Sequence, residues 1–252
     1  MATKDEILTR LLKEENYVSG EELARQTGVS RAAVWKAIKS LKKSGYDIEG
    51  VTKCGYKLKQ NNSLVTAEGV KALLEKDIEV THFDTVDSTN TYCKRLLADG
   101  KQGEFLVTAA KQTAGRGRQG KSFYSPSETG IYFSLVIRPD TSLQNAVTAT
   151  TAAAVAVCKA IEKTTDLKPK IKWVNDVYLN GKKVCGILTE ATTDFESGTV
   201  DSVIIGIGIN ISTTKFPSDV QGAGCLDVDV NRSALIAQTV NEPVSYTHLR
   251  AH

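Results

Sequence analysis

The sequence predicts an α+β protein in two parts, and three patterns support this prediction. In the N-terminal quarter, apolar residues recur at helical spacing in three segments and then alternate, as in strands, around glycines. Downstream, apolar β-type runs at 105–110, 130–137 and 203–210 flank an alanine-rich helical segment at 148–161. The Asn-Gly pair at 180–181 lies between two further β-type runs and indicates a hairpin.

Composition excludes several classes of protein. Of 252 residues, 41% are hydrophobic and 24% are charged, as in globular proteins, and the net charge of +3 alone does not predict nucleic-acid binding. Neither a signal-peptide pattern nor a bilayer-spanning run is present, so we expect a cytoplasmic protein without membrane contact. Five scattered cysteines without a C-x-x-C pair, and one histidine (His82) before the last few residues, indicate neither a disulfide framework nor a zinc or histidine-rich metal site.

The first segment has the order of a winged helix-turn-helix. Ser19 is placed to cap a short helix, and Gly28 suits the tight turn that ends it. Ser30 is placed to cap a second helix over 31–44. The alternation over 46–58 then predicts a β-hairpin wing.

The second helix of this segment carries a basic outer face. Residues early in such a helix make base contacts, and later lysines, here Lys39 and Lys42, are expected at phosphates. The alternative is a small interaction module with solvated lysines, but the cap, turn, basic helix and wing together favour DNA binding. We place this domain at 1–62. The residues expected at the DNA are Ser30, Arg31, Ala33, Lys36 and Lys39.

The polar break at 61–63 starts a second domain, which we place at 63–240. Thr66 is expected to cap a helix through Leu74, and a strand follows over 79–86. Ser88 is expected to cap the next helix, which ends near residue 98. Its hydroxyl also lies at a helix N-terminus, which favours polar or anionic ligand atoms, although spacing alone favours plain capping.

A glycine- and arginine-rich stretch over 112–120, the Gly/Arg loop, directly follows the strand at 105–110. Glycine lets backbone N–H groups converge on an anion, and arginine adds a cationic donor fork, so a phosphate-bearing ligand is favoured over a merely solvated loop. Residues 115–122 match the P-loop expression, but Pro126 disfavours the helix that a P-loop requires. No strand ending in a Walker-B aspartate follows, so we reject a P-loop.

Asp176 and Lys183 are expected on the paired strands of the Asn-Gly hairpin, and therefore close together. Lys183 precedes an apolar run, so it requires a charge partner or an anionic ligand unless it is an exposed hairpin lysine. For Lys182 the exposed alternative is preferred. The glycines of strand 203–210 permit close approach of a ligand. Neither G-x-G-x-x-G nor a following Rossmann helix is present at this strand, which argues against dinucleotide binding.

Five motifs together resemble the biotin–protein ligases that double as biotin-operon repressors, and the match extends to about residue 240. They are Asp87-Ser88-Thr89-Asn90, Gln112 with Gly115-Arg116-Gly117-Arg118-Gln119-Gly120, Lys172-Trp173-Val174-Asn175-Asp176, Lys183 with Gly186-Ile187-Leu188, and Gly206-Ile207-Gly208-Ile209-Asn210. The resemblance implies a catalytic domain of the class II synthetase-like, biotin–lipoate ligase type, built on a mixed sheet behind the winged module.

The resemblance also implies a two-step reaction. ATP and Mg²⁺ activate biotin to biotinyl-5'-AMP, and biotin then passes to a lysine of the biotin carboxyl carrier protein. With the adenylate bound, the protein is expected to form a homodimer that binds operator DNA and represses biotin synthesis. Two alternatives stay open: a biotin-responsive transcription factor without ligase activity, and a lipoate-type ligase, against which the winged module and the arginines argue.

Residue roles follow from the resemblance. It implies contact of Lys183 with the reacting oxygens, and catalysis by Lys183 and Arg118, with Asp176 holding Mg²⁺ or orienting Lys183. The rings of biotin are expected against Ile187, Leu188 and the strand 204–209. The residues expected to bind biotin or the adenylate are Ser88, Thr89, Asn90, Gln112, Gly115, Arg116, Gly117, Arg118, Lys183, Gly186 and Asn210.

The sequence departs from the family in three places. Phe123 stands where tryptophan is usual, which leaves an apolar lid in place. Val174 stands where proline is usual, which is expected to loosen a turn. Judged by the resemblance, we expect the small C-terminal SH3-like β-barrel domain of the family to be missing and residues 241–252 to form a tail foreign to the fold.

Overall fold

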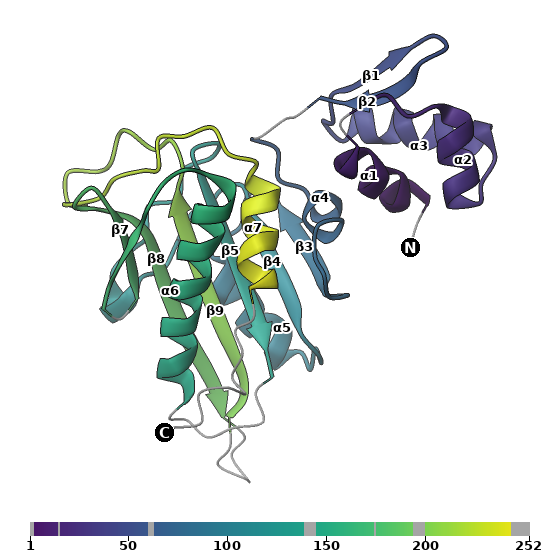
Figure 1. Cartoon of the computed structure of the whole chain (residues 1–252). Coiled ribbons are helices and arrows are strands. Elements are labelled where there is room, and N and C mark those ends of the chain that lie inside the picture. Colours follow the sequence, from purple (N-terminus) through teal and green to yellow (C-terminus); the bar gives the residue numbers. More distant parts are fainter. Residues whose placement is uncertain are drawn as a thin grey trace, which may run out of the picture.

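The computed structural model describes residues 3–14, 16–59, 63–138, 145–173, 175–193 and 200–242, and Figure 1 shows the arrangement of their elements. The N-terminal domain is the predicted winged helix-turn-helix. Its elements are α1 (Thr3–Lys13), α2 (Gly20–Thr27), α3 (Arg31–Lys43), β1 (Ile48–Val51) and β2 (Gly55–Leu58).

Local capping sets the helix-turn-helix. The Ser19 Oγ atom accepts a hydrogen bond from the backbone N–H of Glu22, and the Ser30 Oγ atom accepts one from that of Ala33, as predicted. Gly28 ends α2 with φ of +66°, the left-handed conformation that glycine adopts without strain. The apolar faces of the three helices meet the wing in one core. Its buried members include Ile7, Leu8, Leu11, Leu23, Val34, Ile38, Leu41 and Ile48.

Contacts join this domain to the next one through the short helix α4 (Ala67–Lys71). The Lys4 ammonium lies 2.8 Å from a carboxylate oxygen of Glu68, and the Tyr46 hydroxyl lies 2.5 Å from that of Thr66. Leu64 packs against the N-terminal core although it follows the expected boundary. The break itself, residues 60–62, lies outside the described residues.

The second domain is built on a seven-stranded mixed sheet in the order β3-β4-β5-β9-β8-β7-β6. Strands β3 and β4 pair in parallel, and all other neighbours pair antiparallel. Asn180 and Gly181 form the predicted turn between β7 and β8. The strands are β3 (Glu79–Phe83), β4 (Phe105–Ala109), β5 (Gly130–Ile137), β6 (Lys170–Lys172), β7 (Asp176–Leu179), β8 (Lys182–Thr193) and β9 (Val200–Asn210).

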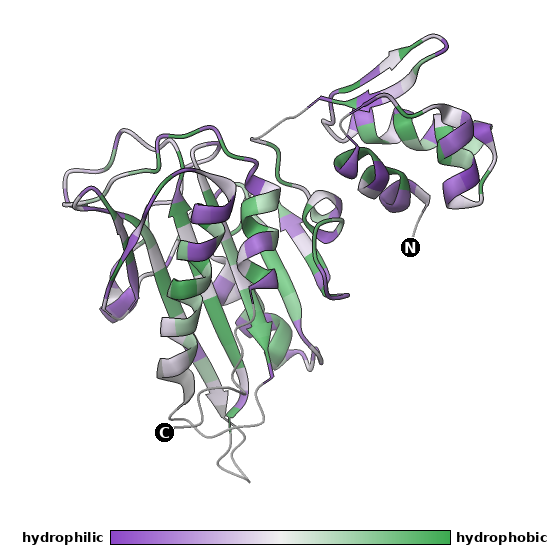
Figure 2. Ribbon diagram, in the orientation of Figure 1, coloured by the Kyte–Doolittle hydropathy of each residue, from purple (hydrophilic) through white to green (hydrophobic). Residues whose placement is uncertain are grey.

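Helices cover both faces of the sheet (Figure 1). The long helix α6 (Asn145–Thr164) and the helix α7 (Arg232–Asn241) pack on one face, and α5 (Thr89–Ala98) packs on the other. Because side chains alternate along a strand, Ile205, Ile207 and Ile209 of β9 join the core under α6, whereas Ile204 joins the smaller core under α5. Figure 2 shows the apolar character of these central strands.

Several boundaries differ from the sequence prediction. Helix α4 ends at Lys71 instead of near Leu74, and β3 ends at Phe83 instead of residue 86. Helix α7 was not predicted at all. Val174, which is expected to loosen its turn, lies outside the described residues. No helix in the described ranges combines the length and apolarity needed to cross a membrane.

Tertiary contacts hold the two residues that follow the expected domain boundary at residue 240. Asn241 ends α7 and its side chain donates to the carbonyl of Leu73. Glu242 is 6% exposed and forms ion pairs with Lys159 and Lys163 of α6. The rest of the expected tail, 243–252, lies outside the described residues.

Candidate functional site

The central hollow of the second domain lies on the α5 face of the sheet, where three strand positions carry no side chain. Gly206, Gly208 and Gly186 occupy this face of β8 and β9. A Cβ atom on Gly206 would lie 2.0 Å from the Asn90 Oδ1 atom, and one on Gly208 would lie 2.4 Å from the ring of Phe123. These glycines therefore create the space that side chains from the opposite wall occupy. We call this space the first hollow.

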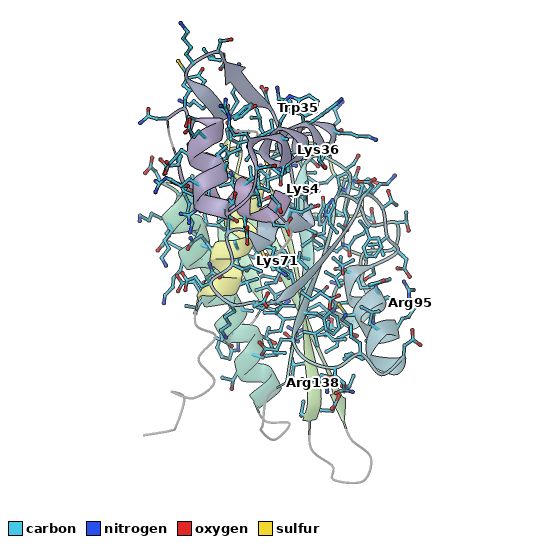
Figure 3. The ribbon with its side chains drawn as sticks, turned by 90° about the vertical axis from the view of Figure 1, so that its right-hand side faces the viewer. Lys4, Trp35, Lys36, Lys71, Arg95 and Arg138 are labelled. Carbon is cyan, nitrogen blue, oxygen red and sulfur yellow. The ribbon has the colours of Figure 1, made fainter. Side chains whose placement is uncertain are left out.

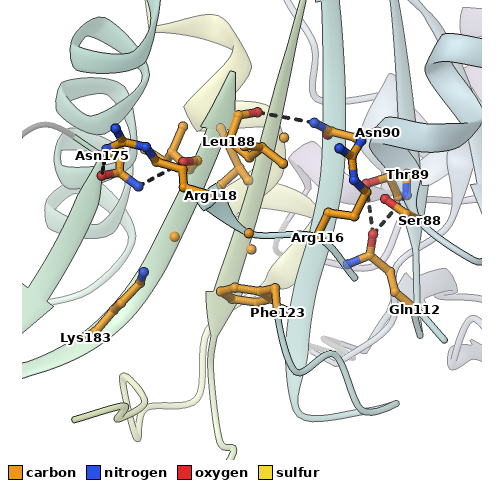
Figure 4. A pocket seen from close by; sticks show the side chains of 16 residues that line it. Ser88, Thr89, Asn90, Gln112, Arg116, Arg118, Phe123, Asn175, Lys183 and Leu188 are labelled. Atoms are coloured by element: carbon orange, nitrogen blue, oxygen red, sulfur yellow. Dashed lines mark hydrogen bonds between the residues drawn. The ribbon is translucent and has the colours of Figure 1, made fainter. Parts of the chain in front are cut away.

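Most of the predicted binding residues line the first hollow together (Figure 4). They come from α5, from the Gly/Arg loop and from β8, which are distant in sequence. Gly115 does not line it, although its carbonyl accepts a hydrogen bond from the N–H of Phe123 and so shapes the loop. The predicted residues in the lining are Ser88, Thr89, Asn90, Gln112, Arg116, Gly117, Arg118, Lys183 and Gly186.

A buried polar network fixes the wall at the start of α5. The Ser88 Oγ atom accepts from the N–H of Thr91 at 3.4 Å, so this residue both caps the helix and lines the hollow. The Gln112 side-chain oxygen accepts from the N–H of Thr89 at 2.9 Å. The Ser134 hydroxyl lies 2.7 Å from the Thr89 hydroxyl oxygen and 2.6 Å from the Asn90 side-chain oxygen. Such a network holds its polar groups in one arrangement.

The Gly/Arg loop folds back on itself above this wall. The N–H of Gly117 donates to the carbonyl of Lys121, and a Cβ atom on Gly115 would lie 2.4 Å from the carbonyl oxygen of Phe123. The chain forms only a short 3₁₀ turn, Arg118–Gly120, and is extended at Lys121. Because no helix begins at Lys121, the rejection of a P-loop is confirmed.

Two arginines of the loop are held at opposite sides of the first hollow (Figure 4). The Arg118 guanidinium donates to the side-chain oxygen of Asn175 at 2.8 Å, and the Asn175 amide donates to the carbonyl of Ile187. The Arg116 guanidinium donates to a carboxylate oxygen of Glu190 at 3.0 Å. The loop therefore crosses the hollow with one cation fixed on each side.

The predicted proximity of Asp176 and Lys183 is confirmed. The Lys183 Nζ atom lies 2.7 Å from the Asp176 Oδ1 atom, across paired strands whose register shifts beside them. Apart from this lysine, the buried Oδ1 atom has no polar partner among the described residues. Lys183 lines the first hollow but Asp176 does not, so Asp176 reaches the hollow only through the lysine.

A second hollow adjoins the first one, and Phe123 and Lys183 line both. Asn210, expected beside the other binding residues, lies here instead, together with Lys121 and Phe216. Its amide group donates to the carbonyl of Gly224, while its buried side-chain oxygen accepts no hydrogen bond from the described residues.

Glu190 is a residue of this site that the sequence prediction missed. Its side chain is 16% exposed and bonds to Asn90, Lys94 and Arg116. Burial alone would raise the pKa of this carboxyl, but hydrogen bonds from Lys94 and Asn90 and the nearby cationic charges outweigh burial, so the pKa is lowered from its ordinary value. Alternation along the strand could have identified this residue, because it places residue 190 on the same face of β8 as Gly186.

One expectation about the apolar lining was wrong in part. Leu188 and Ile187 line the first hollow as expected, but Ile205 and Ile209 lie in the core under α6. The alternating pleat decides this, because it turns every second residue of β9 away from the hollow.

The basic face of α3 is solvent-exposed, as predicted. Arg31, Lys36 and Lys39 are exposed, and the Lys39 ammonium lies 5.2 Å from the ring centroid of Trp35. Trp35, which the prediction did not include, is 55% exposed on the same helix (Figure 3). A DNA contact by any of these residues stays a prediction.

Known proteins share this architecture. The sequence pattern of the biotin/lipoate A/B protein ligase family matches residues 82–210, and an HTH domain pattern matches residues 3–57. The bifunctional ligase/repressor BirA of Bacillus subtilis (strain 168) is 38% identical over 210 residues, which are 81% of this chain and 64% of that protein. BirA of Escherichia coli (strain K12) is 30% identical over 240 residues, which are 93% of this chain and 74% of that protein.

Solved structures agree with these relationships. The biotin protein ligase from Aquifex aeolicus in complex with biotin and ATP gives a TM-score of 0.54 at 29% identity, over 64% of this chain and 66% of that chain. The present chain spans slightly less than two thirds of the length of the Bacillus relative.

Proposed function

The chain belongs to the biotin/lipoate A/B protein ligase family, and from this we propose that it activates biotin with ATP and transfers biotin to a lysine of a biotin carboxyl carrier protein. The observation that carries the proposal is the pair of hollows sharing Phe123 and Lys183. A ligand in two linked parts, such as biotinyl-adenylate, fits two hollows with a cation at their junction. The Aquifex relative was solved with biotin and ATP, which supports the same assignment.

We assign biotin to the first hollow. Its polar wall of Ser88, Thr89 and Gln112 offers hydrogen-bonding groups to a polar ring, and Leu188 offers an apolar surface. The nucleotide is assigned to the second hollow, where the buried, unpaired side-chain oxygen of Asn210 is available to accept from a ligand N–H or O–H group.

In the first step, a carboxylate oxygen of biotin attacks the α-phosphorus of ATP. A new P–O bond forms, the bond to the β-phosphate oxygen breaks, and pyrophosphate leaves with the electron pair. Biotin's carboxylate is already ionised at neutral pH, so this step needs no general base. The chain's task is positioning and charge stabilisation, which Lys183 supplies at the junction of the hollows and Arg118 supplies in the first hollow.

In the second step, a lysine amine of the carrier protein attacks the acyl carbon of the adenylate. The new C–N bond replaces the C–O bond to phosphate, AMP leaves, and the amine releases a proton. The same cations stabilise the departing phosphate.

Magnesium enters the proposal with the nucleotide, because Mg²⁺ in such sites is held by one or two carboxylates and the substrate phosphates, whose charge it neutralises. Within the described ranges, no group of three or more His, Cys, Asp or Glu side chains is placed to hold a metal ion alone. Asp176 has one buried carboxylate oxygen, whose partner is the Lys183 ammonium at 2.7 Å. We assign it to Mg²⁺ or to orienting the lysine, the two roles that its position allows.

We also propose that the adenylate-bound protein forms a homodimer and represses transcription by binding operator DNA in the cytoplasm. The basic α3 and the names of the BirA relatives support the DNA-binding part. The five free cysteines fit a reducing compartment.

Pyrophosphate release from biotin, ATP and magnesium tests the enzymatic proposal. Replacing Lys183 by alanine should lower turnover about 10²- to 10³-fold, because it removes a cation at the site of charge development. Lys182→Ala is the matched control, since this adjacent lysine is exposed and should leave turnover unchanged. Biotin binding without pyrophosphate release by the unaltered chain would favour the transcription factor. Preferential binding of lipoate would favour the lipoate-type ligase.

A further inference from the structure

The Glu190 carboxylate lies just behind the wall of the first hollow and gathers three donors. One oxygen accepts from the Asn90 amide at 3.0 Å and from the Arg116 guanidinium at 3.0 Å. The other oxygen accepts from the Lys94 ammonium at 2.7 Å. Asn90 and Arg116 line the hollow, whereas Glu190 and Lys94 do not.

The partners of this carboxylate come from different parts of the fold. Glu190 lies on β8, opposite Ile204 of the central strand β9, so its backbone is fixed by the sheet. Arg116 belongs to the Gly/Arg loop, which lies outside the sheet and pairs with itself through Arg116 and Ser122. The contact between Arg116 and Glu190 therefore ties the loop to the sheet.

Engagement with Glu190 leaves Arg116 able to bind a ligand. A guanidinium has five N–H donors, and the contact with Glu190 uses the Nη1 group. Its remaining donors are available for the carboxylate or phosphate of a ligand in the hollow. Glu190 and an anionic ligand can thus hold the same arginine from two sides, and neither has to displace the other.

We propose that Glu190 is a positioning residue that anchors the Gly/Arg loop across the first hollow through Arg116. The part of this proposal that concerns biotin rests on the function proposed above. Loss of the anchor should free one side of the loop while Arg118 still holds the other side at Asn175. A bound ligand should then escape faster, because the loop that covers it opens more often.

Limited trypsin digestion of the ligand-free protein tests the anchor without any assumption about biotin. Arg118 is exposed, and cleavage after it requires the backbone to leave its folded conformation, so the cleavage rate measures how often the loop opens; mass spectrometry identifies this cut. Glu190→Gln keeps the shape of the side chain but removes its charge, and should accelerate cleavage after Arg118 about tenfold. Lys94→Met is the matched control: it removes a second ion pair from the same carboxylate without touching the loop, and should change the rate less than about twofold.

A double-mutant cycle shows whether the effect passes through Arg116. In an Arg116→Gln background the anchor is already lost, so Glu190→Gln should no longer accelerate cleavage after Arg118. Equal acceleration in both backgrounds would overturn the proposal, because it would mean that Glu190 acts through general stability. No acceleration in either background would overturn it as well.

Biotin dissociation supplies the second readout. Glu190→Gln should release biotin about tenfold faster than the unaltered protein, while the association rate changes little. An unchanged dissociation rate would overturn the role of the anchor in ligand retention. If the unaltered protein binds no biotin, the proposed function fails, and the trypsin experiment still decides whether Glu190 anchors the loop.

Discussion

Replacing Gly206 by alanine should detach the side chain of Asn90 from the sheet. The new Cβ atom would lie 2.0 Å from the Asn90 Oδ1 atom, whereas an ordinary contact begins at 3.4 Å. The amide must therefore move by about 1.4 Å. Gly206 lies on the central strand β9 between β5 and β8, so its own backbone cannot retreat without breaking the ladder on both sides.

The cost follows from the hydrogen bonds that this movement disrupts. The Asn90 side-chain oxygen accepts from Ser134 at 2.6 Å, and its amide donates to the carbonyl of Leu188 at 3.3 Å and to Glu190 at 3.0 Å. A neutral hydrogen bond contributes about 1 kcal/mol and one to a charged group about 2 kcal/mol. Allowing for partial relaxation, we expect Gly206→Ala to lower the free energy of unfolding by about 3 kcal/mol.

Urea denaturation of Gly206→Ala, Asn90→Ala and the double variant measures this effect. If the clash with Asn90 is the cause, Gly206→Ala should cost less than about 1 kcal/mol once Asn90 is alanine, because the contacted atoms are gone. An equal cost in both backgrounds, or a cost below about 1 kcal/mol in the unaltered protein, would refute the reasoning.

Three further outcomes follow from side chains in or near the sheet. Phe123→Ala uncovers the glycines beneath its ring and should raise the Kd for both biotin and ATP in calorimetry, since the ring borders both hollows. Burial lowers the pKa of His82, so the unfolded chain binds the proton at a higher pH than the folded protein does, and stability should fall as pH drops below about 6.5 toward the lowered pKa. Urea titrations should show that this dependence of stability on pH disappears in His82→Gln. A dependence that persists in the variant would contradict the assignment to His82. Burial raises the pKa of Cys93 to about 12 and also raises that of Cys185. A thiol reagent at pH 8 should therefore label the exposed Cys54 first, and prompt labelling of the buried pair would contradict this burial.

Local chemistry made part of this structure predictable from sequence. The caps at Ser19, Ser30, Thr66 and Ser88 depend only on a hydroxyl and an N–H group three residues later, and all four are confirmed. The rejection of a P-loop was equally local, since it depended on Pro126 a few residues beyond the loop.

The parts of the site that could not be predicted from the sequence depend on pairing between residues that lie far apart along the chain. Asn210 lines the second hollow instead of the first because β9 continues beyond Gly206 and Gly208, which border the first hollow, before it ends. Glu190 follows its nearest motif residue by only two positions, but its partners are 100 and 74 residues away along the chain. Alternation along β8 predicts which face of the sheet Glu190 occupies, but it does not predict these partners.

The three cations that line the first hollow are held by partners of different charge, so they differ in how strongly they attract an anion. Arg116 and Lys183 each face a carboxylate, Glu190 and Asp176, which neutralises much of their field. Arg118 is held by the neutral amide of Asn175, so its full charge remains available. A neutral partner is also released at lower electrostatic cost than a carboxylate, because no opposite charge is left unpaired. An incoming phosphate should therefore draw its ground-state binding energy mainly from Arg118, whereas Lys183 acts chiefly on the charge that develops in the transition state and Arg116 chiefly through the position that Glu190 imposes.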